Sequence, residues 1–235
     1  MEVHPTPGCL SIGGNEEFVM QLMMEMPELV DTSMIYGEPR EKLKEAILIV
    51  SMEGLMPAFE HLKKIRALTG QEPELNRKQL YEDFTRVLWH AYKDLTQKAA
   101  KMMEPEFGFP FQKDTQFEAG LATWNKKQPQ MAKVFGPYLQ LQRTAWQNEL
   151  STFRNYLEHR DETDPQVYAV HYEPAHAEKL FDEVWRTIAD ILAMLVSLHL
   201  PLGVRLMEIP PDQRTKVSPH RFCFDVPGIT SNRQK

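Results

Sequence analysis

The apolar residues of this chain recur, over most of its length, at the spacing of an α-helix. Steps of three to five residues separate them in four long segments, which are 43–65, 81–102, 135–157 and 180–195. A helix has about 3.6 residues per turn, so this spacing gathers the apolar side chains into one stripe on each helix. Each stripe needs a partner that buries it, and the four segments therefore predict an all-α bundle. No segment alternates with a period of two for long enough to predict a sheet.

Proline and glycine mark the predicted ends and breaks of these helices. Pro57 predicts a kink in the first segment, because proline lacks a backbone donor and its ring crowds the preceding turn. Gly136 and Pro137 predict an interruption near the start of the third segment. Residues 104–114, EPEFGFPFQKD, have the glycine and proline content of a loop.

The domain organisation follows from these segments. Residues 1–40 predict an N-terminal arm with one short helix, and 41–206 predict an up-and-down bundle of four to five main helices. Residues 207–235 are rich in proline, arginine, lysine and serine, and we expect an extended or disordered tail. The length of 235 residues, with 42% hydrophobic and 26% charged residues, is ordinary for a soluble globular protein.

Charge and hydropathy narrow the classes of partner. The net charge of −6 argues against a protein that wraps nucleic acid non-specifically, since such binding needs a surplus of lysine and arginine, although a local basic site is compatible with it. The most hydrophobic run, 187–204, is interrupted by Asp190, His199 and Pro201, so we expect a buried helix and no membrane partner. The first residues do not have the pattern of a secretory signal. Cys9 and Cys223 have no metal-binding spacing, and the simplest inference is a reducing, cytoplasmic setting.

Several familiar site patterns are absent from the sequence. It has no GxxxxGK[ST] or GxGxxG phosphate loop, no GxSxG elbow and no HExxH zinc motif. A di-metal bundle needs two Glu-x-x-His motifs, and the chain has one, from Glu173 to His176. His171, Glu173 and His176 could supply metal ligands at a helix start, but a short histidine-containing loop is more often solvated surface. We therefore expect no resident metal and no cofactor.

The stretch FRNYLEHRD, residues 153–161, contains the strongest candidate chemistry. An arginine, Arg154, is followed by the polar Asn155 and then, after three residues, by His159, with Glu158 between them. This pattern resembles the R-x(4–6)-H signature of the HEPN superfamily, in which the residue after the arginine is commonly polar and the motif lies in the C-terminal half of an α-helical bundle. The resemblance covers the helical body, about residues 41–206, through one short motif and an architecture.

The resemblance implies a metal-independent endoribonuclease, of the kind found among toxins and host-defence effectors. His159 would act as general base on the ribose 2′-hydroxyl or as general acid on the leaving oxygen. Arg154 would hold the scissile phosphate and stabilise the charge that develops on its oxygens. Asn155 would orient His159 or a phosphate oxygen, and Glu158 would position Arg154 or tune the histidine. The implied partners are RNA, a second copy of the chain, and an antitoxin or other regulatory protein.

The geometry of a helix limits how Arg154 and His159 can act on the same phosphate. At about 100° per residue, Arg154 and His159 lie some 140° apart around a regular helix, whereas Arg154 and Glu158 share a face. Both groups can act on one phosphate if the helix ends or bends there, and DETDP at 161–165 is typical of a helix end. A homodimer is another solution, because two copies of the motif can form one composite cleft across a two-fold axis.

The alternative is a non-catalytic bundle that binds a protein or a nucleotide. A cationic arginine and histidine near a helix C-terminus complement the negative end of the helix dipole, and Arg154 with Glu158 is an ordinary surface pair. The acidic residues Asp161, Glu162 and Asp164 follow the motif, where an RNA enzyme would favour cations.

Overall fold

The computed structural model describes residues 19–159, 165–214 and 221–226, and these form two compact units. One unit comprises residues 48–188, and the other comprises residues 1–47 together with 189–235. Cys9 and the acidic residues Asp161, Glu162 and Asp164 lie outside the described residues.

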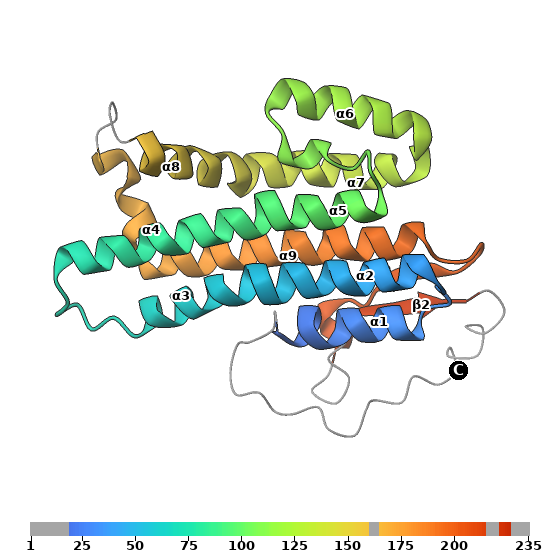
Figure 1. Ribbon diagram of the computed structural model, residues 1–235, viewed down its shortest axis with the longest axis horizontal. Coiled ribbons are helices and arrows are strands. Elements are labelled where there is room, and N and C mark those ends of the chain that lie inside the picture. The colour runs from blue at the N-terminus through green and yellow to red at the C-terminus, as the bar shows by residue number, and fades with distance from the viewer. Residues whose placement is uncertain (1–18, 160–164, 215–220, 227–235) are drawn as a thin grey trace. The chain divides into compact units, whose positions relative to one another are not determined.

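The unit of residues 48–188 is an all-α bundle in its described part, which confirms the predicted fold class (Figure 1). Its α-helices are α3 (Met56–Arg66), α4 (Glu74–His90), α5 (Gln97–Met103), α6 (Asp114–Lys127), α7 (Pro129–Gln142), α8 (Asn148–His159) and the first part of α9 (Pro174–Leu198). Two 3₁₀ segments, η4 (Phe109–Phe111) and η6 (Pro165–Tyr172), connect them. The interruption predicted at Gly136 and Pro137 is wrong, because α7 runs through both residues.

Three π-helical segments lengthen the helices of this unit. They are η2 (Ile49–Leu55), η3 (Ala91–Thr96) and η5 (Arg143–Gln147), which precede α3, α5 and α8 respectively. A π turn closes its hydrogen bonds between residues five apart, so it holds one residue more than an α turn. Gly54 of η2 lies against Ala91 of η3, and a Cβ added to Gly54 would lie 3.0 Å from the Ala91 Cβ. The close approach of η2 and η3 therefore depends on the absence of a side chain at position 54.

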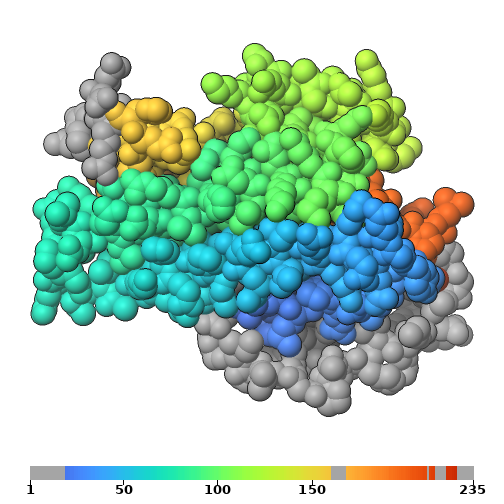
Figure 2. Space-filling model, viewed as in Figure 1, coloured from blue at the N-terminus to red at the C-terminus, as the bar shows by residue number. Residues whose placement is uncertain are grey.

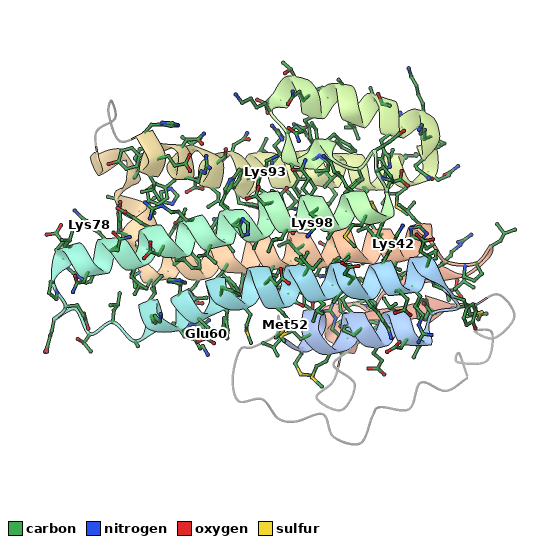
Figure 3. The ribbon with its side chains drawn as sticks, viewed as in Figure 1. Lys42, Met52, Glu60, Lys78, Lys93 and Lys98 are labelled. Carbon is green, nitrogen blue, oxygen red and sulfur yellow. The ribbon has the colours of Figure 1, made fainter. Side chains whose placement is uncertain are left out.

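Helix α4 lies between two neighbours in the bundle, since it packs against α3 and against α8 (Figure 1). The space-filling view shows the side chains of α3 and α4 meeting along the visible face (Figure 2). Figure 3 labels Glu60 on α3 and Lys78 on α4, both of which form ion pairs within their own helices, with Lys63 and Glu74 respectively. The polar faces of these helices therefore carry local pairs, and the apolar stripes form the core.

The segment predicted as a loop at 104–114 supplies an aromatic core of its own. Phe107, Phe109 and Phe111 are each at most 4% exposed, although the chain turns sharply around them. The ring centroids of Phe107 and Trp124 are 5.1 Å apart, which anchors the segment on α6. Lys93, labelled in Figure 3, donates a hydrogen bond from η3 to the Phe111 carbonyl oxygen. Glycine and proline correctly indicated a turn here, but the burial of the three phenylalanines comes from tertiary packing.

The second unit contains helices and a small sheet. Its helical elements are η1 (Val19–Glu25), α1 (Met26–Thr32), α2 (Glu38–Leu48) and the short η7 (Pro211–Gln213). Strands β1 (Arg205–Glu208) and β2 (Phe222–Asp225) pair antiparallel, and Arg205 lies opposite Asp225. Part of the segment for which we expected an extended or disordered tail thus forms a two-stranded sheet.

A charged network fastens this sheet within its unit. Arg221 donates to Asp190 Oδ1 at 2.6 Å and to Glu208 Oε1 at 2.9 Å, and the backbone amide of Phe222 donates to Glu25 Oε1 at 2.7 Å. Arg221 is 9% exposed, so its guanidinium needs these two carboxylates to offset the loss of hydration. In the described part of the chain, no helix is both long enough and apolar enough to cross a bilayer.

Candidate functional site

Helix α8 positions the arginine-histidine motif through its buried stripe. Leu150, Phe153 and Leu157 are at most 4% exposed and point into the core. Because these residues fix the rotation of the helix, Arg154 is partly exposed and His159 is exposed. Phe153 and Leu157 belong to the apolar stripe predicted for segment 135–157, and both are buried.

Arg154 is held by two neighbours on its own helix. Its Nη1 lies 2.6 Å from Glu158 Oε2 and 3.1 Å from Asn155 Oδ1. The predicted pair of Arg154 with Glu158 is therefore present, with both side chains about one third exposed. Such an exposed pair contributes only a few tenths of a kcal/mol to the free energy of unfolding. Its main effect is to restrict where the guanidinium points.

His159 is the last residue of α8, and its side chain is exposed. Among the described residues it has no hydrogen-bond or ion-pair partner, and no contact joins it to Arg154. The helix end that the convergence of the two side chains requires was predicted at 161–165, and 161–164 of this segment lie outside the described residues. Residues 160–164, which follow, lie outside the described part of the chain.

A second group of polar side chains converges near the start of α8. Glu149 lies in the first turn of α8. Its Oε1 atom is 3.4 Å from Nε2 of His171 and 3.4 Å from Nε2 of His176. His171 belongs to the last turn of η6, and His176 to the first turn of α9. Nδ1 of His171 and Nε2 of His176 are 3.1 Å apart, a hydrogen-bond distance in which one ring donates and the other accepts.

Aromatic packing fixes the ring of His171 in this cluster. Its imidazole stacks on Phe153 with the ring centroids 4.0 Å apart and the planes inclined by 10°. The ring of His176 meets that of His171 edge-on, with centroids 4.5 Å apart. Phe153 thus belongs to the buried stripe of α8 and also holds the ring of His171 in place.

Burial keeps both histidines of the cluster neutral near pH 7. Burial, together with the nearby His176, lowers the pKa of His171 to about 4. Burial also lowers the pKa of His176, an effect that the carboxylates of Glu149 and Glu173 oppose. Neutral imidazoles keep a lone pair on one ring nitrogen and can serve as hydrogen-bond acceptors or as metal ligands.

The sequence identified this cluster only in part. Its candidate ligands were His171, Glu173 and His176, whereas the structure groups the two histidines with Glu149. Glu149 lies more than twenty residues earlier in the chain, and it joins the histidines through the packing of α8 on η6. The spacing of Glu149 and Phe153, four residues apart on one helix face, is the signal that could have placed it beside His171.

No protein-family model, no curated protein and no solved structure matches the chain. The resemblance to the HEPN superfamily accordingly rests on the motif at Arg154 to His159 and on the helical architecture that carries it.

Proposed function

We propose that this protein is a metal-independent endoribonuclease of HEPN type in which Arg154 and His159 act on one scissile phosphate of RNA. The observation that supports the proposal most directly is the position of the motif on α8. Its arginine is partly exposed and its histidine is exposed, so both are accessible to solvent. A macromolecular substrate needs such an accessible site, because a phosphodiester within a strand cannot enter a closed core.

The contacts of Arg154 suit it to phosphate binding. Glu158 and Asn155 both engage Nη1, and no contact with a described residue engages Nη2 or Nε. These two nitrogens form a fork that matches two oxygens of a phosphate. Glu158 would therefore act as a positioning residue, and Arg154 would stabilise the charge that develops on the phosphate oxygens during cleavage.

His159 supplies the proton transfer in this mechanism. An exposed imidazole can accept the proton of the ribose 2′-hydroxyl or donate one to the departing 5′-oxygen. The 2′-oxygen attacks the adjacent phosphorus, so the bond from phosphorus to the 5′-oxygen breaks and a cyclic phosphate remains. Asn155 would orient a phosphate oxygen or His159, and no step needs a metal ion.

A homodimer supplies the missing convergence of the two groups. On one copy of α8 the two side chains are not in contact, and a regular helix separates their directions by some 140°. Two copies related by a two-fold axis can place Arg154 of one beside His159 of the other. An antitoxin or another regulatory protein that covers this face would control such a site.

A non-catalytic bundle that binds a protein or a nucleotide is the second candidate. The pairing of Arg154 with Glu158 favours it, because the carboxylate neutralises much of the charge that a phosphate would need. The two functions differ in one measurable respect, which is turnover of RNA.

Cleavage of RNA in EDTA by the purified full chain tests the proposal. We expect the parent protein to cut single-stranded RNA, and Arg154→Ala and His159→Ala each to reduce the rate at least a hundredfold. Arg86→Ala and His90→Ala are matched controls, since Arg86 is partly exposed and His90 is exposed on α4, and they pair with the carboxylates of Asp83 and Asp94 respectively. They should leave the rate unchanged. No cleavage by the parent protein, or equal cleavage by all five proteins, would overturn the proposal.

A further inference from the structure

The cluster of Glu149, His171 and His176 shares no residue with the proposed RNA site and has no part in the proposed cleavage mechanism. One ligand atom from each residue lies within 4.8 Å of the other two. In the described part of the chain, no other group of three such side chains converges in this way. The proposed RNA cleavage therefore does not explain why these three side chains converge.

We infer that Glu149, His171 and His176 form a binding site for a divalent transition-metal ion, with Zn²⁺ as the best match. In a tetrahedral zinc site the metal–ligand bonds are about 2.0–2.1 Å long, so neighbouring ligand atoms lie roughly 3.3–3.4 Å apart. Glu149 Oε1 lies 3.4 Å from Nε2 of each histidine, which is the separation of two ligand atoms on one such ion. The histidine contact of 3.1 Å uses the other nitrogen of His171, Nδ1, and one ligand atom from each of the three residues lies within 4.8 Å of the other two. Small side-chain rotations would therefore bring one nitrogen of each histidine and Oε1 of Glu149 to the separation that such an ion imposes.

The donor set selects the class of metal. Two imidazole nitrogens and one carboxylate oxygen are typical zinc ligands, and three protein ligands leave a fourth position for water. Calcium and magnesium favour sites built from oxygen alone, and the cluster has no thiolate for a softer ion such as Cu⁺. The site is therefore of the open, three-ligand kind and not a closed structural cage.

The surroundings of the cluster meet two further requirements of a metal site. The stacking of His171 on Phe153 restrains a ligand that is only 5% exposed, which reduces the entropy lost on binding. The side chain of Glu149 is 45% exposed, and this gives an ion and a water molecule a path from solvent. A hydrogen bond between Nδ1 of His171 and Nε2 of His176 holds the two rings together.

An ion bound here would tie together elements on both sides of residues 160–164. Glu149 lies on α8, which carries Arg154 and His159, whereas His171 and His176 lie on η6 and α9. Metal binding would therefore stabilise the packing of η6 and α9 on α8 without touching the proposed RNA site. The inference does not depend on ribonuclease activity.

Metal binding by the intact, tag-free chain tests the inference directly. After treatment with EDTA and dialysis, titration with Zn²⁺ followed by calorimetry should give one ion per chain with a dissociation constant in the micromolar range or below. Co²⁺ should give the visible absorption of a four- or five-coordinate ion. Glu149→Gln and His176→Ala should each weaken Zn²⁺ binding at least tenfold.

His90→Ala is the matched control, because His90 Nδ1, at the end of α4, lies 2.8 Å from Asp94 Oδ2 of η3 in an exposed histidine–carboxylate pair. This variant should bind Zn²⁺ as the parent does. The inference is wrong if the folded parent binds no stoichiometric Zn²⁺, or if Co²⁺ gives only the weak spectrum of a six-coordinate ion. It is equally wrong if His90→Ala weakens binding as much as the cluster variants. Circular dichroism of each variant establishes that a loss of binding is not a loss of fold.

Discussion

Gln147 joins two buried polar groups that have no access to water. Its Oε1 accepts a hydrogen bond from the Tyr92 hydroxyl at 3.0 Å, and its Nε2 donates to the Pro110 carbonyl oxygen at 2.9 Å. Tyr92 and Gln147 are at most 5% exposed, and burial raises the pKa of the Tyr92 hydroxyl, which therefore stays protonated. An amide at position 147 thus satisfies a donor and an acceptor at once.

Replacing this amide should be costly because both partners stay buried. We expect Gln147→Met to lower the free energy of unfolding by about 2–4 kcal/mol in urea denaturation, since the Tyr92 hydroxyl and the Pro110 carbonyl lose their partners. The double variant with Tyr92→Phe should be less destabilised than the sum of the two single variants, because it leaves one fewer unpaired group. Strict additivity would contradict this account of the network.

The buried His171 should make the stability of the metal-free protein depend on pH. Its pKa is about 4 in the folded chain and near 6.5 in the unfolded chain, so between these values only the unfolded chain binds the proton. The free energy of unfolding should therefore be unaffected by this group above pH 6.5. It should fall as the pH drops from 6.5 to 4, by at most about 3 kcal/mol.

Urea denaturation in EDTA at several pH values measures this effect. Carboxylates also titrate as the pH falls toward 4, so the informative quantity is the difference between two proteins. His171→Phe retains a ring against Phe153 and should flatten the dependence, whereas the exposed His90→Gln should not. An unchanged slope in His171→Phe would show that His171 titrates normally.

At the scale of elements, Gly120 determines how closely η4 lies on α6. A Cβ at this position would overlap the Cβ of Phe109 and lie 2.9 Å from its Cγ. Phe109 is buried among Phe107, Phe117 and Trp124 and has little room to move. The glycine is needed here for close approach and not for a special backbone angle.

Gly120→Ala should therefore destabilise the protein although alanine is the better helix former. The gain in helix propensity is about 1 kcal/mol, and we expect the steric displacement of Phe109 to exceed it, for a net loss of about 1–3 kcal/mol. Gly136→Ala on α7 is the matched comparison, since its Cβ would meet only the end of the Leu121 side chain at 3.2 Å. That variant should be close to neutral. Thermal unfolding of both proteins measures the difference, and a stabilised Gly120→Ala would contradict the packing described here.

Hydrophobic periodicity was sufficient to predict the four long helical segments but neither α6 nor the contacts between helices. Stripes such as Leu150, Phe153 and Leu157 were predictable because burial on one helix face leaves a regular signal. The burial of Phe107 and Phe111 was not predictable, since it depends on contacts with other elements, with Trp124 of α6 for Phe107 and with Tyr92 of η3 for Phe111. Glu149 was missed for the same reason, because its histidine partners are brought to it by tertiary packing. The pairing of Arg154 with Glu158 was predictable, since both belong to one helix.

At the scale of the whole molecule, the proposed ribonuclease requires a second copy of the chain. We expect light scattering to give the mass of a dimer at micromolar concentration. A monomer would remove the composite cleft and leave the single helix, whose geometry separates Arg154 from His159.

Mixed dimers test whether the two catalytic groups come from different copies. In a dimer of Arg154→Ala with His159→Ala, one cleft keeps both intact groups and the other keeps neither. Random mixing makes half of the dimers mixed, so the mixture should recover about one quarter of the parent activity if the cleft is composite. Each variant alone should remain inactive. Absence of recovery after subunit exchange, verified by mass spectrometry, would place both groups within one chain.

The π-helical segments have a consequence for evolution as well as for packing. Each of η2, η3 and η5 holds one residue more than the α turn it replaces, and so does η1 in the other unit. Loss of one codon within such a segment would restore an α turn and leave the register of the flanking helix intact. A single deletion inside α4 or α8 would instead rotate the rest of the stripe by about 100°. We therefore expect homologous chains to differ in length by single residues at 19–25, 49–55, 91–96 and 143–147 before they differ elsewhere in the helices.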